Sequence, residues 1–202
     1  MTRQRSSRSS ATRRSPAKSM GKLRIIGGDF RRRQLPVLDS PGLRPTPDRV
    51  RETLFNWLGQ QLYGKRVLDL FAGTGALGIE ALSRGATQLT FVESDAQVAR
   101  HITQNLETLG AHQGHVIVGD ARTFLSQSAA RYDIVFLDPP FHQGWVADCC
   151  SALETGGWLA EEAMIYVETE RDLIPEVPTR WSLHRETQAG ESTARLYQRH
   201  AP

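Results

Sequence analysis

The sequence predicts an α/β protein in which helices cover both faces of a parallel sheet and an antiparallel hairpin completes that sheet. Two observations lead to this fold class. From residue 64 onward, short apolar runs alternate with segments of helical periodicity, which is typical of successive βαβ units. The last two β-rich runs instead flank a short turn that contains Gly190, which predicts an antiparallel strand pair.

The elements follow in a regular order along the chain. In the alternating part we expect strands at residues 66–71, 88–93, 115–119, 132–138 and 164–168. Helices are expected between them, at residues 76–84, 96–109, 121–128 and 145–153. The final hairpin is expected at residues 181–187 and 193–199.

Three parts of the chain are expected to differ in character. Residues 1–21 are rich in Arg and Ser and contain no acid, so we predict a disordered basic tail, with an organellar transit peptide as the alternative. Residues 22–62 are predicted to form an N-terminal extension. It consists of a hairpin with strands at 23–26 and 34–37, a proline-rich loop at 39–47, and a helix at 49–62 capped by Asp48. Residues 63–202 are predicted to form the catalytic domain.

Charge is distributed unevenly between the two ends of the chain. Residues 1–51 contain 14 Lys or Arg and three acids, a balance of +11, whereas the remaining residues contain 11 basic and 19 acidic side chains, a balance of −8. This division indicates a basic surface that faces a polyanion, although a merely solubilising tail would give the same pattern.

Several classes of protein are disfavoured by the composition. No apolar run approaches the roughly 20 residues of a membrane-spanning helix. Cys149 and Cys150 are adjacent and no Cys/His spacing resembles a zinc site, so we expect no metal and interpret both as small apolar residues in a reducing cytoplasm.

The first chemical motif is a glycine-rich turn after the first strand of the alternating part. Asp69 is followed by Gly73, Gly75 and Gly78, and glycines at such a turn let the backbone approach a ligand closely. The spacing also fits a dinucleotide fingerprint, so the glycines alone leave NAD and S-adenosylmethionine open. Asp69 favours the second, because a carboxylate suits a cationic amino-acid group better than a pyrophosphate.

Two further acids end the next two strands. Glu93 is placed to accept the hydroxyls of an adenosine ribose, and Asp95 is the better candidate for capping the following helix. Asp120 and the amide of Ala121 are placed to bind an adenine, although an Asp that only caps a helix is common.

The motif that points to a reaction is Asp138-Pro139-Pro140-Phe141, at the end of the fourth strand. An exocyclic amino group on a base is a poor nucleophile because its lone pair is delocalised into the ring. The Asp138 carboxylate and the Pro139 carbonyl can accept its N–H groups and so localise that lone pair, while the prolines hold the acceptors rigidly. Phe141 offers a face on which the base can stack. The alternative is an ordinary Pro-Pro turn.

Taken together, these motifs resemble those of the bacterial methyltransferase family, usually called RsmD, that modifies guanine N2 of 16S ribosomal RNA. The resemblance covers about residues 24–199 and is most specific at Arg24-Ile-Ile-Gly-Gly28, at Leu43-Arg-Pro-Thr-Pro-Asp-Arg-Val-Arg-Glu-Thr-Leu-Phe-Asn56, and at the two motifs that begin with Asp69 and Asp138. It implies the Rossmann-like class I methyltransferase fold and S-adenosylmethionine as cofactor. The implied substrate is 16S rRNA within an assembled or assembling 30S subunit, and we expect a cytoplasmic monomer.

The resemblance also implies roles for individual residues. The cofactor-binding set is Asp69, Phe71, Gly73, Gly75, Glu93, Asp120 and Ala121, and the catalytic set is Asp138, Pro139 and Phe141. The expected substrate-binding residues are Arg24, Arg31, Arg32, Arg33, Arg44, Thr46 and Arg49. Alternatively, Arg49 and Arg51 lie on a solvated helix face or pair with Glu52.

Three other functions remain open at this point. An enzyme that methylates adenine N6 or cytosine N4 of DNA would use the same motif, but the short basic region before Asp48 leaves little chain for reading a duplex, which favours RNA. A non-catalytic RNA-binding factor is opposed by the intact Asp138 motif. An NAD-dependent oxidoreductase is opposed by that motif and by Asp69.

Overall fold

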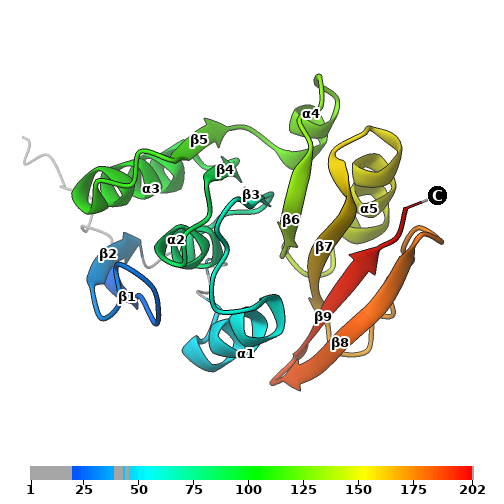
Figure 1. Ribbon diagram of the computed structural model, residues 1–202, viewed down its shortest axis with the longest axis horizontal. Coiled ribbons are helices and arrows are strands. Elements are labelled where there is room, and N and C mark those ends of the chain that lie inside the picture. The colour runs from blue at the N-terminus through cyan, green and yellow to red at the C-terminus, as the bar shows by residue number, and fades with distance from the viewer. Residues whose placement is uncertain (1–19, 39–42, 44–45, 202) are drawn as a thin grey trace, which may run out of the picture.

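The computed structural model describes residues 20–38, 43 and 46–201, which form a seven-stranded sheet, a separate two-stranded sheet and five helices (Figure 1). The two-stranded sheet pairs β1 (Met20–Arg24) with β2 (Gln34–Leu38). The large sheet contains β3 (Arg66–Asp69), β4 (Gln88–Glu93), β5 (Gly114–Val118), β6 (Tyr132–Leu137), β7 (Leu159–Glu170), β8 (Trp181–Ala189) and β9 (Ser192–Arg199). The helices are α1 (Asp48–Leu58), α2 (Ala76–Ser83), α3 (Ala96–Leu109), α4 (Ala121–Leu125) and α5 (Trp145–Thr155).

The strand order of the large sheet is β5-β4-β3-β6-β7-β9-β8. Strands β3 to β7 are parallel to one another, and β9 pairs antiparallel with both β7 and β8. The chain moves outward from β3 to β5 and then returns to the other side of β3 as β6. The order therefore reverses between β3 and β6, and open α/β sheets bind ligands beyond the carboxyl ends of their strands at such a point.

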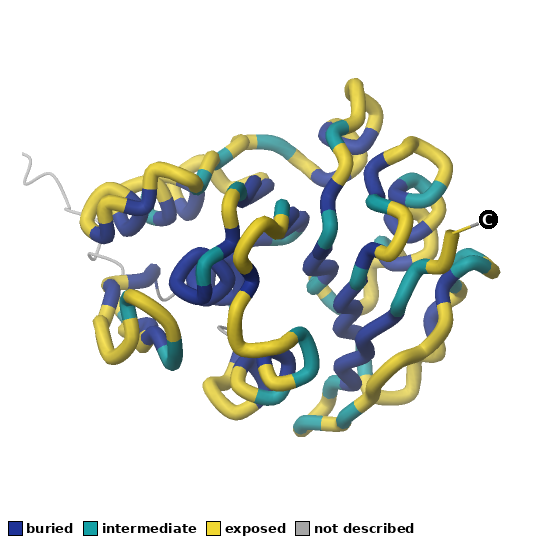
Figure 2. The backbone as a smooth tube through the Cα atoms, in the orientation of Figure 1, coloured by how far each residue is buried: buried dark blue, intermediate teal, exposed yellow. Residues whose placement is uncertain are grey.

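Both faces of the sheet are buried, as the near-continuous apolar runs of the parallel strands predict. Helices α1, α2 and α3 and the β1–β2 hairpin share one core with Val67, Phe91 and Phe136. Helices α4 and α5 share the other core with Val135 and Val167. Figure 2 shows this burial in the central strands and in α2, all eight residues of which are buried, whereas β8 is largely exposed.

A fully buried carboxylate joins the N-terminal extension to the sheet. Glu80 on α2 accepts hydrogen bonds from the backbone N–H groups of Ile26 (3.0 Å) and Gly27 (2.8 Å). It also pairs with Arg51 of α1 (3.4 Å) and Arg84 (2.9 Å). The hairpin, α1 and α2 therefore meet at one side chain, and the hairpin and α1 share a core with the large sheet.

The predicted order of elements is confirmed, with differences at several ends. The first helix begins at Asp48 and ends at Leu58, where Gly59 has a φ of 93°, rather than running to residue 62. The prediction that Asp48 caps this helix was wrong. Pro47 occupies the N-cap position, and the Asp48 carboxylate pairs with Arg51 and, at 3.3 Å, with Arg24.

Strand β7 differs most from its predicted bounds, because it runs from Leu159 to Glu170 rather than over 164–168. Its pairing with β6 is interrupted between Tyr132 and Ile134, where the register shifts. Within the part of the chain that the structure describes, no helix is long and apolar enough to cross a membrane.

Candidate active site

The glycine-rich turn between β3 and α2 forms one wall of the site. Gly73 has a φ of 55° and Gly75 a φ of 80°, which are left-handed conformations that favour glycine. The buried carboxylate of Asp69 accepts the backbone N–H of Gly78 at 3.1 Å, so it holds the start of α2 against the end of β3. A side chain at Gly73 would come within 3.5 Å of Leu43, which places part of the 43–47 segment beside this turn.

Asp69 also has unusual acidity for an aspartate. Its pKa is raised to about 7: burial is the main cause, the hydrogen bond from Gly78 opposes it, and the nearby charge of Glu93 adds to it. The free protein therefore has an acid at this site that titrates near neutral pH. A cation bound beside Asp69 would favour its charged form.

Glu93 lies at the carboxyl end of β4 and braces the glycine turn from the neighbouring strand. One of its carboxylate oxygens accepts the N–H of Gly73 at 2.8 Å, and the other accepts the N–H of Asp95 at 2.8 Å. As predicted, Asp95 caps α3, by accepting the N–H groups of Gln97 and Val98. Glu93 therefore faces the glycine turn, and its role as a ribose ligand stays a prediction.

Asp120 caps α4 at the end of β5. Its carboxylate accepts the N–H of Thr123 at 3.0 Å and the Thr123 hydroxyl at 2.6 Å, and these bonds lower its pKa. Ala121 is buried at the first position of the helix. The capping role that the sequence left as an alternative is thus present, and an adenine-binding role for Asp120 and Ala121 stays a prediction.

The Asp138 motif extends from the end of β6 into the space beyond the sheet. Asp138 lies beside Glu168, because the strand register pairs Leu137 with Val167. Burial, followed by the charges of Glu168 and Asp69, raises the pKa of Asp138 well above its usual range. Three acids from three neighbouring strands therefore influence one another at this edge of the sheet.

Glu170 holds the turn that follows the motif. Its carboxylate accepts the backbone N–H of His142 and lies 3.4 Å from the ring Nδ1 of the same residue. His142 has a φ of 61°, and its ring makes an edge contact with Phe141. Glu170 thus connects the end of β7 to the turn that carries Phe141, and it is a positioning residue that the sequence analysis missed.

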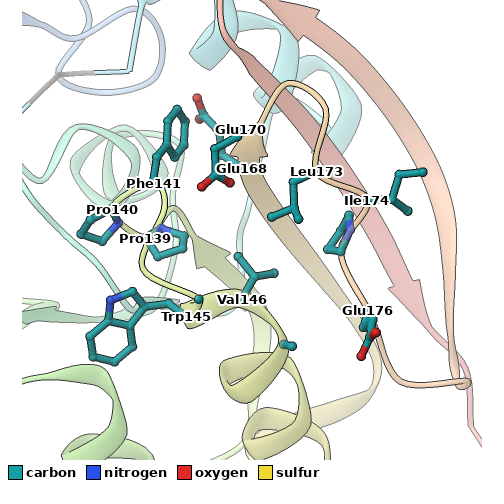
Figure 3. Close-up of a pocket in the computed structure, with 13 residues that line it drawn as sticks. Pro139, Pro140, Phe141, Trp145, Val146, Glu168, Glu170, Leu173, Ile174 and Glu176 are labelled. Atoms are coloured by element: carbon teal, nitrogen blue, oxygen red, sulfur yellow. The ribbon is translucent and has the colours of Figure 1, made fainter.

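A cavity of about 320 Å³ opens at this edge (Figure 3). Figure 3 shows the Glu168 carboxylate between Phe141 on one side and Leu173 on the other. The volume lies within the range of about 300–1,000 Å³ that small-molecule sites occupy. Its lining comes from the Asp138 motif, the start of α5, the end of β7 and the following loop: Pro139, Pro140, Phe141, Gly144, Trp145, Val146, Ala147, Glu168, Glu170, Leu173, Ile174, Pro175 and Glu176.

Phe71 belongs to an aromatic wall that the sequence did not reveal. Its ring makes an edge contact with Trp145, with centroids 5.4 Å apart, and the guanidinium of Arg122 lies 4.2 Å from the Trp145 ring. The three residues come from the glycine turn, α5 and α4. Of the three, Trp145 also lines the cavity.

The predicted substrate-binding residues lie in different surroundings. Arg31, Arg32, Arg33 and Arg49 are exposed, and Arg33 donates to the backbone oxygen of Thr108. Arg24 is exposed and pairs with Asp48. Thr46 is buried, and its backbone oxygen accepts a hydrogen bond from Arg51 at 3.3 Å. Arg44 lies outside the described residues.

Arg51 corrects one alternative from the sequence analysis. The prediction that it is solvated or pairs with Glu52 was wrong, because Arg51 is 1% exposed and pairs with Asp48 and Glu80. Glu80 lies 29 residues further along the chain, so no local pattern could have identified it. Within the described residues, no cluster of His, Cys, Asp and Glu could hold a metal ion.

Comparison with known proteins identifies similar chains. The family model described as conserved hypothetical protein 95 matches residues 23–198. The ribosomal RNA small subunit methyltransferase D of Escherichia coli (strain K12) is 53% identical over 182 residues, covering 90% of this chain and 92% of that protein.

Solved structures of methyltransferases have a similar fold. The structure of the putative methyltransferase yhhF from Escherichia coli has a TM-score of 0.85 and 50% identity, covering 90% of this chain and all of that one. The structure of SMU.776, a putative methyltransferase complexed with SAH, has a TM-score of 0.66 and 17% identity, covering 93% of this chain and 57% of that one, so it supports the fold alone.

Proposed function

Because the chain belongs to the ribosomal RNA small subunit methyltransferase D family, we propose that it methylates the exocyclic N2 of a guanine in 16S rRNA, with S-adenosylmethionine as the methyl donor. The observation that carries this proposal is the Asp138-Pro139-Pro140-Phe141 motif: its last three residues line the cavity, and Asp138 lies near Glu168 and Asp69.

The described residues fit a cofactor that carries positive charge. Asp69 is buried and has a pKa of about 7, so a nearby cation would relieve the cost of ionising it. Gly73, Gly75 and Phe71 would hold the methionine portion, Glu93 the ribose, and Asp120 with Ala121 the adenine. When bound, S-adenosylmethionine supplies an electrophilic methyl group on a sulfonium sulfur.

The chain's own contribution to catalysis is to hold and activate the amine. The Asp138 carboxylate and the Pro139 carbonyl accept the two N–H groups, and this localises the nitrogen lone pair. Phe141 stacks against the base, and in other proteins such stacking contributes about 1–3 kcal/mol of binding free energy per base. The N–C bond would form as the S–CH3 bond of the sulfonium breaks and S-adenosylhomocysteine is released, and the extra proton would pass from the nitrogen to Asp138 or water.

RNA binding is assigned to the basic N-terminal region. The exposed guanidinium groups of Arg31, Arg32, Arg33 and Arg49 suit phosphate contacts, and Arg24 lies beside them on the hairpin. The position of Leu43 near Gly73 supports a path for the 43–47 segment beside the cofactor, which would bring Arg44 and Thr46 toward the site. The acceptor in this proposal is an assembled or assembling 30S particle, and the enzyme acts in the cytoplasm as a monomer.

Methyl transfer from labelled S-adenosylmethionine to three acceptors tests the proposal. The acceptors are small subunits from cells that lack this protein, naked 16S rRNA, and DNA, with nucleoside analysis of each product. We expect N2-methylguanosine in the subunits, and the naked-RNA reaction shows whether the ribosomal proteins are required. Label only in DNA, as N6-methyladenine or N4-methylcytosine, would overturn the substrate while keeping the amine chemistry.

Ligand-dependent melting separates the enzyme from the oxidoreductase alternative. S-adenosylhomocysteine is expected to raise the melting temperature, because a ligand that binds only the folded state stabilises it, whereas NAD is expected to have no effect. A rise with NAD alone would contradict the proposed cofactor.

A further inference from the structure

Glu168 is a buried carboxylate that lines the cavity. It lies near the end of β7, is 8% exposed, and follows Val167, which pairs with Leu137 of β6. Its Oε2 accepts the hydroxyl of Tyr166 at 2.8 Å, and Tyr166 is itself fully buried. This bond fixes the position of the carboxylate. The described residues make no hydrogen bond to its other oxygen, Oε1, and Figure 3 shows the side chain between Phe141 and Leu173.

Within the part of the chain that the structure describes, no cation pairs with either of these two acids. Among the ion pairs of the described residues, none involves Asp138 or Glu168. Buried carboxylates that are not paired are costly, and they are generally satisfied by hydrogen bonds. Glu168 therefore lines the cavity, and Asp138 lies beside it, directly before the lining residue Pro139, so two acceptors from neighbouring strands meet at this edge.

The other carboxylates that line the cavity are used differently. Glu170 is engaged by the backbone N–H and the ring of His142. Glu176 is exposed and follows Pro175 in the loop after β7. Glu168 alone among these three is buried, fixed and next to Asp138.

Among the bases with exocyclic amines, guanine matches two adjacent acceptors best. Its ring N1–H lies beside the N2 amino group, so both are donors, whereas the ring nitrogen beside the amine of adenine or cytosine is an acceptor. Enzymes that act on an extruded base read its Watson–Crick edge by hydrogen bonds. An ionised carboxylate can accept hydrogen bonds but cannot donate them. It would therefore repel adenine N1 or cytosine N3, which are acceptors as well.

We propose that Glu168 is a specificity-determining residue that accepts the N1–H of the target guanine, while Asp138 addresses the N2 amine. This inference rests on the proposed function and deepens it. The Asp138 motif alone serves adenine and cytosine amines as well, so it does not select among the bases. The acceptor on the neighbouring strand supplies that selection.

The test compares guanosine with 2-aminopurine riboside at the nucleotide that the wild-type enzyme methylates. The analogue keeps the N2 amine but has an acceptor at N1. Small subunits are rebuilt with 16S RNA that carries either base in a ligated synthetic segment, and methylation rates are measured for the wild type, Glu168→Gln and Glu162→Gln. Glu162 is an exposed residue of the same strand, away from the cavity, so it is the matched control.

We expect the wild type to prefer guanosine by about tenfold to a hundredfold, as loss of a hydrogen bond to a charged group implies. A glutamine can accept from N1–H or donate to an acceptor, so Glu168→Gln is expected to reduce that preference at least about tenfold. The analogue also lacks the O6 oxygen, but this affects all three enzymes equally. Glu162→Gln should keep the wild-type ratio.

Two results would overturn the inference. One is a wild-type enzyme that methylates both bases at similar rates, a measurement that needs no variant to fold. The other is an active Glu168→Gln variant whose preference stays within about twofold of the wild type. Absence of label from the guanosine-containing subunits with the wild type would instead overturn the proposed function, so the two failures are distinguishable.

Discussion

At the scale of single residues, the site depends on carboxylates whose burial alters their acidity. Asp69 and Asp138 both have raised pKa values because the ends of β3 and β6 remove them from water. A group whose pKa is raised on folding stabilises the folded state at low pH, and this contribution is lost as the pH rises through the folded value. For Asp69 the window runs from about 4, the ordinary value, to about 7.

Cofactor affinity should follow the ionisation of Asp69. We expect the affinity for S-adenosylmethionine to rise between pH 6 and 8, because a cationic ligand binds the charged carboxylate better than the neutral one. Calorimetric titration at several pH values measures this, and below the pKa each pH unit can change the affinity by up to about tenfold. Asp69→Asn should flatten the pH profile, whereas the exposed Asp172→Asn should not. A profile unchanged by Asp69→Asn would show that another group controls binding.

Asp138→Ala should separate catalysis from cofactor binding. The substitution removes an acceptor for the amine, so we expect the turnover rate to fall at least about a hundredfold, as for other lost transition-state hydrogen bonds. The melting shift with S-adenosylhomocysteine should stay near the wild-type value. Methylation at close to the normal rate would refute the role of Asp138, and Asp172→Ala provides the control.

The sequence revealed these acids because each has a local signal. Asp69 precedes glycines and Asp138 precedes prolines, at the ends of apolar runs. Glu168 ends a predicted strand but no glycine or proline follows it directly, and Glu170 lies beyond the predicted end of that strand. Trp145 was expected in a helix, but its contact with Phe71 depends on tertiary packing.

At the scale of elements, the buried ion-pair network around Glu80 connects the hairpin, α1 and α2. The order of these elements could be predicted from apolar periodicity, but their connection could not. Arg51 and Glu80 are far apart in sequence, and a charged residue on a helix is usually solvated. Asp48 was predicted to cap α1 because it precedes an apolar periodic segment, but its carboxylate forms ion pairs with Arg24 and Arg51 instead.

Replacing Glu80 should destabilise the whole molecule. Glu80→Gln leaves the buried guanidinium of Arg84 without a carboxylate and that of Arg51 with Asp48 alone, and breaking a buried pair in this way costs about 3–5 kcal/mol of unfolding free energy. Urea unfolding measures the loss. Glu52→Gln, on the exposed face of α1, should change stability by less than about 0.5 kcal/mol. Equal effects of the two substitutions would contradict the importance of this network.

At the scale of the whole molecule, charge is divided between a basic N-terminal region and an acidic catalytic edge. The strand order places Asp69 and Asp138, at the ends of β3 and β6, at the point where the sheet reverses, and this could be anticipated from the βαβ pattern. The division suits an enzyme that must hold a polyanion near a site rich in carboxylates. The basic region attracts the phosphates, and it is separate from the carboxylates, which would repel them.

Removing the N-terminal segment should weaken RNA binding in a salt-dependent way. Residues 1–19 carry six Lys or Arg, and deletion up to residue 19 leaves β1 intact, since that strand begins at Met20. We expect a lower affinity and a flatter plot of log affinity against log salt, because fewer counterions are released. A chain of full length in which the six cations are replaced by Gln should behave like the deletion. An unchanged salt slope would make the segment passive in binding.

The irregular pairing at the start of β7 has a consequence for how such an enzyme could evolve. Leu159 pairs with Tyr132, but the regular ladder resumes only at Met164, opposite Ile134. Any gain or loss of one residue in a continuous ladder would slide the whole strand and turn its side chains over. An insertion or deletion in this irregular segment can leave the register of the following ladder unchanged. Alternatively, it can shift the rest of β7 by one residue against β6, which brings Val167 or Thr169 beside Asp138. Base preference could thus diverge between descendants through insertions and deletions far from the cavity, with no substitution among the residues that line it.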